Sequence, residues 1–289
     1  MKRNQSSITA EGIAMARAFE SQNPADERIC FDPYARFFVR APFMLMGKLF
    51  FGYARRRSPG VFEFLATRCR YIDDYAQACL ASGIAQMVIL GAGFDTRAYR
   101  FEQIKQGVKV FEVDHPATQA IKLEKLKSIM GTIPEHVTFV PIDFAQQSLE
   151  RLCASGYDEH LKSLFIWEGV THYLPPKAVD AALAFIARCS DAGSSIIFDY
   201  LDASALKGQL KHKELVSMKR YQRVTGEGIV FGIAPEQITE FLECRGFTDI
   251  VNADREYLRR MYFTGTRSAR PLASDYAIVH ATVKRAERR

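Results

Sequence analysis

The sequence predicts an α/β protein built on a mostly parallel central sheet with helices on both faces. From Gln86 onward, short apolar runs of strand length alternate with longer stretches of helical periodicity, as in βαβ units. The first run, 87–90, is apolar throughout and stops at Gly91, which is typical of a strand buried on both faces of a parallel sheet. The first 82 residues show helical patterns, so a helical preface precedes the sheet.

The elements follow in order from these patterns. Apolar residues at helical spacing predict preface helices near 9–20 and 61–81. Strands are expected near 86–90, 108–113, 137–141, 163–168 and 194–200, with helices between them near 116–130, 148–155 and 177–189. A helix near 235–244 and strands near 247–252 and 275–283 close the chain.

The stretch 202–235 breaks this alternation. It is rich in lysine, histidine and glutamine and contains a glycine pair, Gly226 and Gly228. We expect it to be an inserted, mobile lid.

Composition excludes several classes of protein. Apolar residues make up 48% and charged residues 25%, which are ordinary globular values. The longest apolar candidate for a membrane span, 41–53, is interrupted by Pro42, Gly47, Lys48 and Gly52. The amino-terminal residues are polar and resemble no export signal. We therefore expect a soluble, cytoplasmic protein without a membrane partner.

Cysteine spacing and charge narrow the possible ligands. The six cysteines form no C-x-x-C pair and no zinc spacing with histidine, so we expect free thiols and no metal. Lys and Arg total 39 against 33 Asp and Glu, a formal charge of +6 that favours an anionic substrate. The basic residues form no single stripe with interleaved aromatics, so we expect no nucleic-acid partner.

The turn after the first strand indicates a nucleoside site. Gly91 and Gly93 allow a sharp turn and a close approach of ligand to backbone. A dinucleotide fingerprint needs a third glycine where Thr96 stands, so a bound pyrophosphate is disfavoured. Asp114, at the end of the next strand, is placed to take ribose hydroxyls. This combination suits a nucleoside without a diphosphate, such as S-adenosylmethionine.

Several blocks of sequence resemble a known family. They are Thr-Ala at 9–10 with Arg-Ala at 17–18, Asp-Pro-Tyr-Ala at 32–35, Arg-Cys-Arg-Tyr-Ile-Asp-Asp at 68–74, Leu-Gly-Ala-Gly-Phe-Asp-Thr-Arg at 90–97, Glu-Val-Asp-His-Pro at 112–116 and Trp-Glu-Gly-Val-Thr-His-Tyr-Leu at 167–174. With these blocks the chain resembles the leucine carboxyl methyltransferase-like family, from about Thr9 to Tyr173 and more loosely to the end. The resemblance implies the Rossmann-like class I methyltransferase fold and S-adenosylmethionine as methyl donor.

The resemblance also implies roles for cofactor-binding residues. Arg68 would hold the methionine carboxylate, since a guanidinium can make two hydrogen bonds to it. Arg70, two residues on, is the alternative. Gly91 and Gly93 would lie beside the methionine part, and Asp114 would take the ribose.

Two carboxylates and one aromatic ring complete the expected cofactor site. Asp143 would accept the adenine amino group, as the resemblance implies, or would cap a helix starting at Ala145. Phe144 could pack against the adenine ring. Glu168 ends the apolar run 164–167, where a carboxylate is costly unless it faces a site or has a partner. It could hold the methionine ammonium and balance the sulfonium, or form a simple buried ion pair.

Asp95 and Arg97 follow the glycine turn and have two possible roles. Pairing with each other, or capping the next helix, is the more common fate of such residues. Ligand contact is the second possibility.

His172 and Tyr173 are the candidate catalytic residues, on the loop after the fourth strand, where such folds present substrate. A phenol or alcohol acceptor would need one of them as a base, whereas a carboxylate acceptor is already ionised and needs none. His172 could equally be an ordinary capping or surface histidine.

The sequence thus predicts an O-methyltransferase that acts on a carboxylate or hydroxyl of a small, anionic or phenolic molecule. A protein carboxyl terminus is the alternative acceptor, and a non-catalytic nucleoside sensor or an NAD-dependent oxidoreductase are alternatives of other classes. We expect one domain over 1–289, divided into the preface (1–82), the cofactor-binding half (83–201), the lid (202–235) and the closing elements (236–289).

Overall fold

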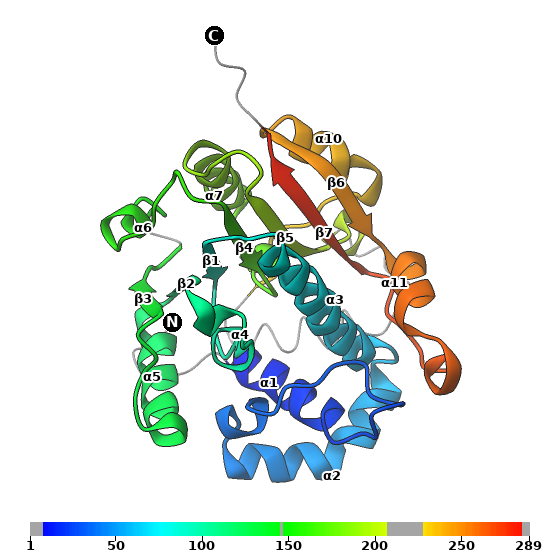
Figure 1. Ribbon diagram of the computed structural model, residues 1–289. Coiled ribbons are helices and arrows are strands. Elements are labelled where there is room, and N and C mark those ends of the chain that lie inside the picture. Colours follow the sequence, from blue (N-terminus) through cyan, green and yellow to red (C-terminus); the bar gives the residue numbers. More distant parts are fainter. Residues whose placement is uncertain (1–7, 145–146, 207–227, 285–289) are drawn as a thin grey trace.

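A computed structural model describes residues 8–144, 147–206 and 228–284 (Figure 1). In this part of the chain, seven strands form one sheet in the order β3-β2-β1-β4-β5-β7-β6. Their bounds are β1 Gln86–Leu90, β2 Lys109–Asp114, β3 Val137–Pro141, β4 Ser163–Trp167, β5 Ser195–Leu201, β6 Phe247–Ala253 and β7 Tyr276–Val283. The first five strands pair in parallel, and β7 runs antiparallel to β5 and β6. The predicted mostly parallel sheet is confirmed.

Helices precede, cover and connect the strands. The α-helices are α1 Ile8–Glu20, α2 Ala41–Arg57, α3 Val61–Ala81, α4 Arg97–Arg100, α5 Pro116–Met130, α6 Arg151–Ala154, α7 Pro176–Arg188, α8 Ala203–Leu206, α10 Ile238–Glu243 and α11 Arg255–Tyr262. Short 3-10 turns are η1 Ala35–Phe38, η2 Ile104–Gln106, η3 Thr171–Tyr173, η4 Pro235–Gln237 and η5 Gly265–Arg267. The helical preface before β1 is confirmed.

Three differences from the predicted elements stand out. The helix expected at 148–155 is only α6, because the Ser148 hydroxyl accepts the Glu150 N–H at 3.2 Å and the chain turns there first. Helices α2 and α11 were not predicted. The predicted lid falls largely on 207–227, outside the described residues.

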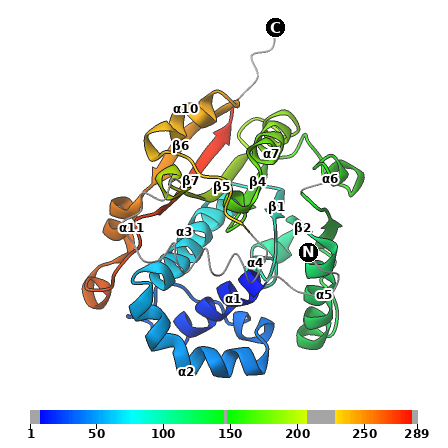
Figure 2. The same ribbon diagram turned by 180° about the vertical axis from the view of Figure 1, so that it is seen from behind.

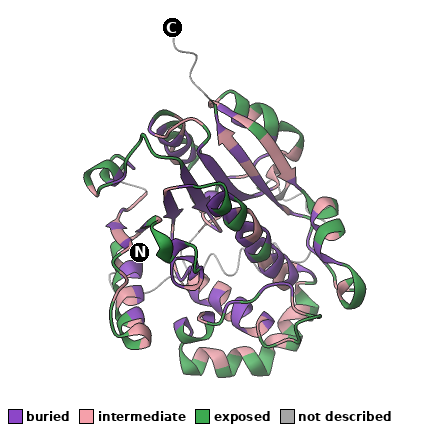
Figure 3. Ribbon diagram, viewed as in Figure 1, coloured by how far each residue is buried: buried purple, intermediate pink, exposed green. Residues whose placement is uncertain are grey.

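Alternate side chains of the strands point into two separate cores. Met87 and Ile89 of β1 belong to the core under α1, α3, α5 and α11, whereas Val88 and Leu90 belong to the core under α6, α7 and α10. Strands β1, β4 and β5 are buried along their whole length (Figure 3). Figures 1 and 2 show the helices on the two faces of the sheet. The α/β fold class is therefore confirmed.

The order of the strands creates the crevice that a ligand would use. The chain winds from β1 through β2 to β3 in one direction, and β4 and β5 lie on the other side of β1. Parallel sheets bind ligands outside the carboxyl ends of the strands, at the point where the order reverses. Here that point lies between Leu90 at the end of β1 and Trp167 at the end of β4.

Candidate active site

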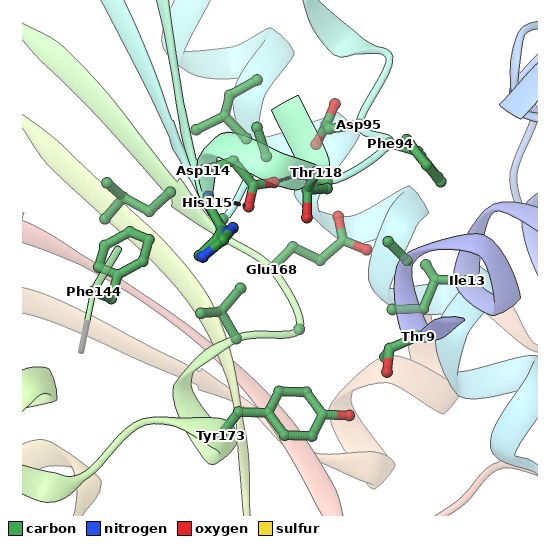
Figure 4. A pocket seen from close by; sticks show the side chains of 18 of the residues that line it. Thr9, Ile13, Phe94, Asp95, Asp114, His115, Thr118, Phe144, Glu168 and Tyr173 are labelled. Carbon is green, nitrogen blue, oxygen red and sulfur yellow. Dashed lines mark hydrogen bonds between the residues drawn. The ribbon is translucent and has the colours of Figure 1, made fainter. Parts of the chain in front are cut away.

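A cavity of about 260 Å³ opens at this reversal point (Figure 4). Its walls come from α1, the glycine turn after β1, the ends of β2 and β3, and the loop after β4. The predicted site residues that line it are Arg68, Gly91, Gly93, Asp114, Asp143, Phe144, Glu168 and Tyr173. Topology therefore brings these residues, from distant parts of the sequence, to one place.

The glycine turn has the backbone geometry that the sequence required. Gly91 and Gly93 have φ angles of +66° and +44°, a region that side chains other than glycine rarely adopt. A Cβ atom on Gly91 would lie 2.4 Å from Cγ2 of Val170. The turn is thus fitted closely against the loop that follows β4.

Asp114 fixes the turn from the end of β2. One carboxylate oxygen accepts the Gly93 N–H, and the other accepts the His115 N–H at 2.6 Å. Burial raises the pKa of Asp114, although these backbone hydrogen bonds act in the opposite direction. The side chain lines the cavity and also ties β1 to β2, so it holds the turn as well as facing any ligand.

Arg68 reaches the cavity from α3 but has two fixed partners. Its Nε donates to Oε1 of Glu168 at 3.0 Å, and its Nη1 donates to Oδ2 of Asp199 at 2.6 Å. The buried Nη2 has no hydrogen-bond partner among the described residues. Protein carboxylates thus engage two of the five N–H donors of Arg68, and its contact with the methionine carboxylate stays a prediction. Arg70, the alternative, is half-exposed and pairs with Asp74 at 2.8 Å, away from the cavity.

Glu168 lines the cavity and forms buried ion pairs, and its contact with the methionine ammonium stays a prediction. Its Oε2 accepts from Nη1 of Arg97 at 2.8 Å. Burial alone would raise the pKa of Glu168, but the charges of Arg97 and Arg68 outweigh it and lower the pKa to about 2. The side chain is therefore a carboxylate at neutral pH.

Arg97 and Arg100 extend this ion-pair network beneath the turn. Arg97 pairs with Asp95, as the sequence indicated, and with Asp73 at 2.7 Å. Arg100 pairs with Asp73 at 2.6 Å. We call the connected set the arginine network; its members are Arg68, Arg97, Arg100, Asp73, Asp95, Glu168 and Asp199. Three arginines against four carboxylates leave it with a net charge of −1 when all are ionised.

Two charged residues of the site had no role assigned from the sequence. Arg17 of α1 lines the cavity, pairs with Asp32 at 2.9 Å and donates to the Phe94 carbonyl at 2.6 Å. Asp199 lies in the apolar strand β5 and accepts the Gly169 N–H at 2.6 Å, in addition to pairing with Arg68. Both residues are charges within an apolar face, where a charge is costly unless it has a partner or faces a site. The same argument identified Glu168.

Asp143 and Phe144 line the cavity, and Figure 4 shows Phe144 on the same side as His115. The Asp143 carboxylate lies 4.0 Å from Nε2 of His115, and its N–H donates to Gln147 at 3.0 Å. The alternative role of Asp143 as a helix cap concerns Ala145, outside the described residues. The adenine contact stays a prediction.

The two candidate catalytic residues have different surroundings. Tyr173 lines the cavity, and Figure 4 shows its ring at the side opposite Asp114. His172 is 4% exposed, does not line the cavity, and packs its ring 4.2 Å from that of Tyr173. Burial lowers the pKa of His172 to about 4. The imidazole is neutral at pH 7 but lies behind the cavity wall, so the geometry supports a packing role for it.

Comparison with known proteins supports the methyltransferase family that the sequence blocks resemble. A model of the leucine carboxyl methyltransferase family matches residues 10–187. The chain belongs to this family. It is 29% identical over 218 residues to the "Putative S-adenosyl-L-methionine-dependent methyltransferase YktD" of Bacillus subtilis, covering 75% of this chain and 71% of that protein. A "Putative S-adenosyl-L-methionine-dependent methyltransferase" of Saccharopolyspora erythraea is 34% identical over 209 residues, which cover 70% of each chain.

Solved structures agree on the fold. A "putative methyltransferase" from Thermobifida fusca superposes with a TM-score of 0.59 at 15% identity, over 94% of this chain and 95% of that one. A DUF574 family protein from Streptomyces avermitilis gives a TM-score of 0.58 at 14% identity, over 94% and 97%. The present chain, a member of the leucine carboxyl methyltransferase family, is therefore a Rossmann-like methyltransferase with S-adenosylmethionine as its cofactor. The NAD-dependent alternative is rejected.

The residues of the cavity fit that cofactor. S-adenosylmethionine carries two positive groups, an ammonium and a sulfonium, and one carboxylate. The unpartnered Nη2 of Arg68 suits the carboxylate, and the net negative charge of the arginine network suits the two cations. No cluster of potential metal ligands occurs within residues 8–144, 147–206 and 228–284. No helix in those ranges is long and apolar enough to cross a membrane.

Proposed function

We propose that the protein is an O-methyltransferase that transfers a methyl group from S-adenosylmethionine to the carboxylate of a small molecule. The observation that supports it is that four of the ionisable groups lining the cavity are engaged by other groups of the protein. Asp95 and Glu168 are in ion pairs, Asp114 accepts two backbone hydrogen bonds, and Nδ1 of His115 accepts the Ala117 N–H at 3.2 Å. None of these is poised as a base, and His172 lies behind the wall.

A carboxylate acceptor suits such a cavity. It is ionised at pH 7 and needs only to be held in line with the sulfonium methyl group. A phenol or alcohol would need a base to remove its proton. The formal charge of +6 also favours an anionic acceptor.

We assign the cofactor contacts accordingly. Arg68, through Nη2, and Arg17 bind the methionine carboxylate, and Glu168 binds the ammonium. Asp114 takes the ribose hydroxyls, and Asp143 with Phe144 takes the adenine. Gly91 and Gly93 let the cofactor approach the backbone, and Tyr173 shapes the acceptor side.

The chemistry of the product tests this proposal. Purified protein is incubated with S-adenosylmethionine labelled on the methyl group and with matched aromatic acids, phenols and alcohols. We expect label in the acids, released as methanol by mild alkali, and a single-turnover rate that is flat above about pH 5. Label stable to alkali, together with a rate that rises through about pH 6.5, would show instead a hydroxyl acceptor with a base.

The second candidate acceptor is the carboxyl terminus of a protein, favoured by the description of the matching family. It predicts that a short peptide with a free terminal carboxylate is labelled, and that its carboxamide form is not. A non-catalytic sensor predicts cofactor binding with no labelled product from any acceptor.

We further propose that the chain acts as one domain in the cytoplasm, in keeping with the free thiols of its cysteines.

A further inference from the structure

Helix α2 is apolar around most of its circumference, yet none of its residues is buried. Five large side chains face outward: Leu45, Met46, Leu49, Phe50 and Tyr53 are 61%, 57%, 71%, 56% and 66% exposed. A helix that is apolar on all sides is normally covered on all sides. Here α2 lies at the outer edge of the preface, beyond α1 (Figures 1 and 3).

The inner side of α2 is held firmly against the preface. A Cβ atom on Gly47 would lie 2.3 Å from the sulfur of Met15, so the two helices approach closely there. Phe51 packs edge-to-face with Phe19 and Phe62, with ring centroids 4.9 and 4.8 Å apart. The outward residues follow the i, i+4 spacing of one helix face. The exposed apolar side chains therefore form a fixed patch on a docked helix.

The charge around this patch is of one sign. The stretch 36–62 contains six basic residues and no Asp or Glu, so its formal charge is +6, the same as that of the whole chain. Arg40 and Arg55 are in ion pairs with Glu11 and Glu63. The other helix cations, Lys48, Arg56 and Arg57, are exposed and form no ion pair with the residues that the structure describes.

We propose that α2 is an interfacial helix that docks this patch on a bilayer containing anionic phospholipids. Its Leu, Met, Phe and Tyr side chains would enter the boundary between headgroups and acyl chains, and its basic residues would contact lipid phosphates. A second copy fits less well, because α2 against α2 would bring like charges together without a carboxylate on either helix. An acidic protein partner is an outcome of the test.

A docked α2 would give the protein a membrane partner, contrary to the expectation drawn from the lack of a spanning segment. Its consequence for function follows from α1, which lies between α2 and the sheet and contributes Thr9, Ile13 and Arg17 to the cavity wall. Docking would hold the cavity close to the bilayer, where an acid with an apolar body is concentrated. The docking itself does not depend on the acceptor proposed above.

Vesicle sedimentation with the full-length protein tests the proposal. We expect binding to vesicles of phosphatidylcholine and phosphatidylglycerol, weak binding to phosphatidylcholine alone, and loss of binding at high salt. Arg56→Gln combined with Arg57→Gln should lower the partition coefficient roughly 30-fold. Leu45→Ser combined with Leu49→Ser should lower it at least roughly tenfold.

Met261→Ser is the matched control, because Met261 is 48% exposed on α11, away from the patch. It should bind vesicles as the wild type does, and all variants should keep wild-type cofactor affinity. The proposal is wrong if anionic vesicles do not bind the wild type, or if the leucine variant binds them equally well. The proposal is also wrong if the wild type self-associates, or captures an acidic protein, in the absence of lipid and the leucine variant loses that association instead of vesicle binding.

Discussion

Replacement of Glu168 by glutamine tests the arginine network and the cofactor site together. The carboxylate is buried between Arg68 and Arg97, and their charges lower its pKa from 4.5 to about 2. A difference of about 2.5 pKa units corresponds to about 3 kcal/mol of folding free energy. Because the folded-state pKa is below the unfolded one, this stability is present above pH 4.5 and is lost as the pH falls toward 2.

Glu168→Gln keeps the shape of the side chain and removes its charge, so urea unfolding at pH 7 should show a loss of about 3 kcal/mol. The variant should also lose less stability than the wild type between pH 4.5 and pH 3. Glu150→Gln is the control, because Glu150 pairs with Arg188 at 3.0 Å but is 60% exposed. It should change the unfolding free energy by less than about 1 kcal/mol.

Calorimetric titration provides the second measurement on the same variant. If Glu168 holds the methionine ammonium, loss of that charged hydrogen bond should weaken S-adenosylmethionine binding roughly 10- to 100-fold. Adenosine lacks the ammonium and should bind both proteins equally. Unchanged S-adenosylmethionine affinity would show that Glu168 serves the network alone. An unchanged unfolding free energy would refute the reasoning from its ion pairs.

Three further substitutions test the remaining residues. Asp114→Ala should weaken cofactor binding by roughly 1.5–3 kcal/mol in calorimetry with an unchanged circular dichroism spectrum, and unaltered affinity would remove Asp114 from the site. Arg68→Lys should weaken binding of S-adenosylmethionine but not of adenosine; equal losses would make Arg68 structural. His172 is kept neutral by burial, with a pKa lowered from 6.5 to about 4, so its stabilising contribution is lost as the pH falls from 6.5 to 4. His172→Gln should abolish that part of the unfolding profile and leave the single-turnover rate on the accepted substrate unchanged and flat with pH. A rate at least 100-fold slower, with loss of a pH step that the wild type shows near 6.5, would make that substrate a hydroxyl acceptor and His172 its base.

The sheet could be predicted from sequence because its signals are local. An apolar run that ends near a glycine or an acidic residue recurs five times, and a predicted helix follows three of these runs. Each predicted strand lies within one residue of the observed bounds. The same locality explains why α2 was missed. Its apolar residues lie on both the inner and outer faces, and Gly47 and Gly52 interrupt them, so no single amphipathic stripe indicates a helix.

The charges of the site could be predicted only one at a time. Glu168 was identified because a carboxylate ends an apolar strand, which requires a partner but does not name it. The partners of Arg68 lie 100 and 131 residues away along the chain. That Asp199 accepts from Nη1 of Arg68, and that Nη2 has no partner among the described residues, depends on the packing of β5 beside β4. No local pattern contains that information.

The net charge of the arginine network should affect how strongly the protein prefers S-adenosylmethionine over the demethylated product. S-adenosylmethionine brings one net positive charge into the cavity, and methyl transfer removes the sulfonium charge. The network, with three arginines and four carboxylates, then keeps a net charge of −1 that the demethylated product no longer balances. In a buried site such an imbalance costs more than it would in water. The network should therefore favour S-adenosylmethionine relative to its product, and Glu168→Gln, which makes the network neutral, should reduce the ratio of the two affinities measured by titration. A ratio that stays the same in the variant would show that the network supports the fold and does not sense the sulfonium charge.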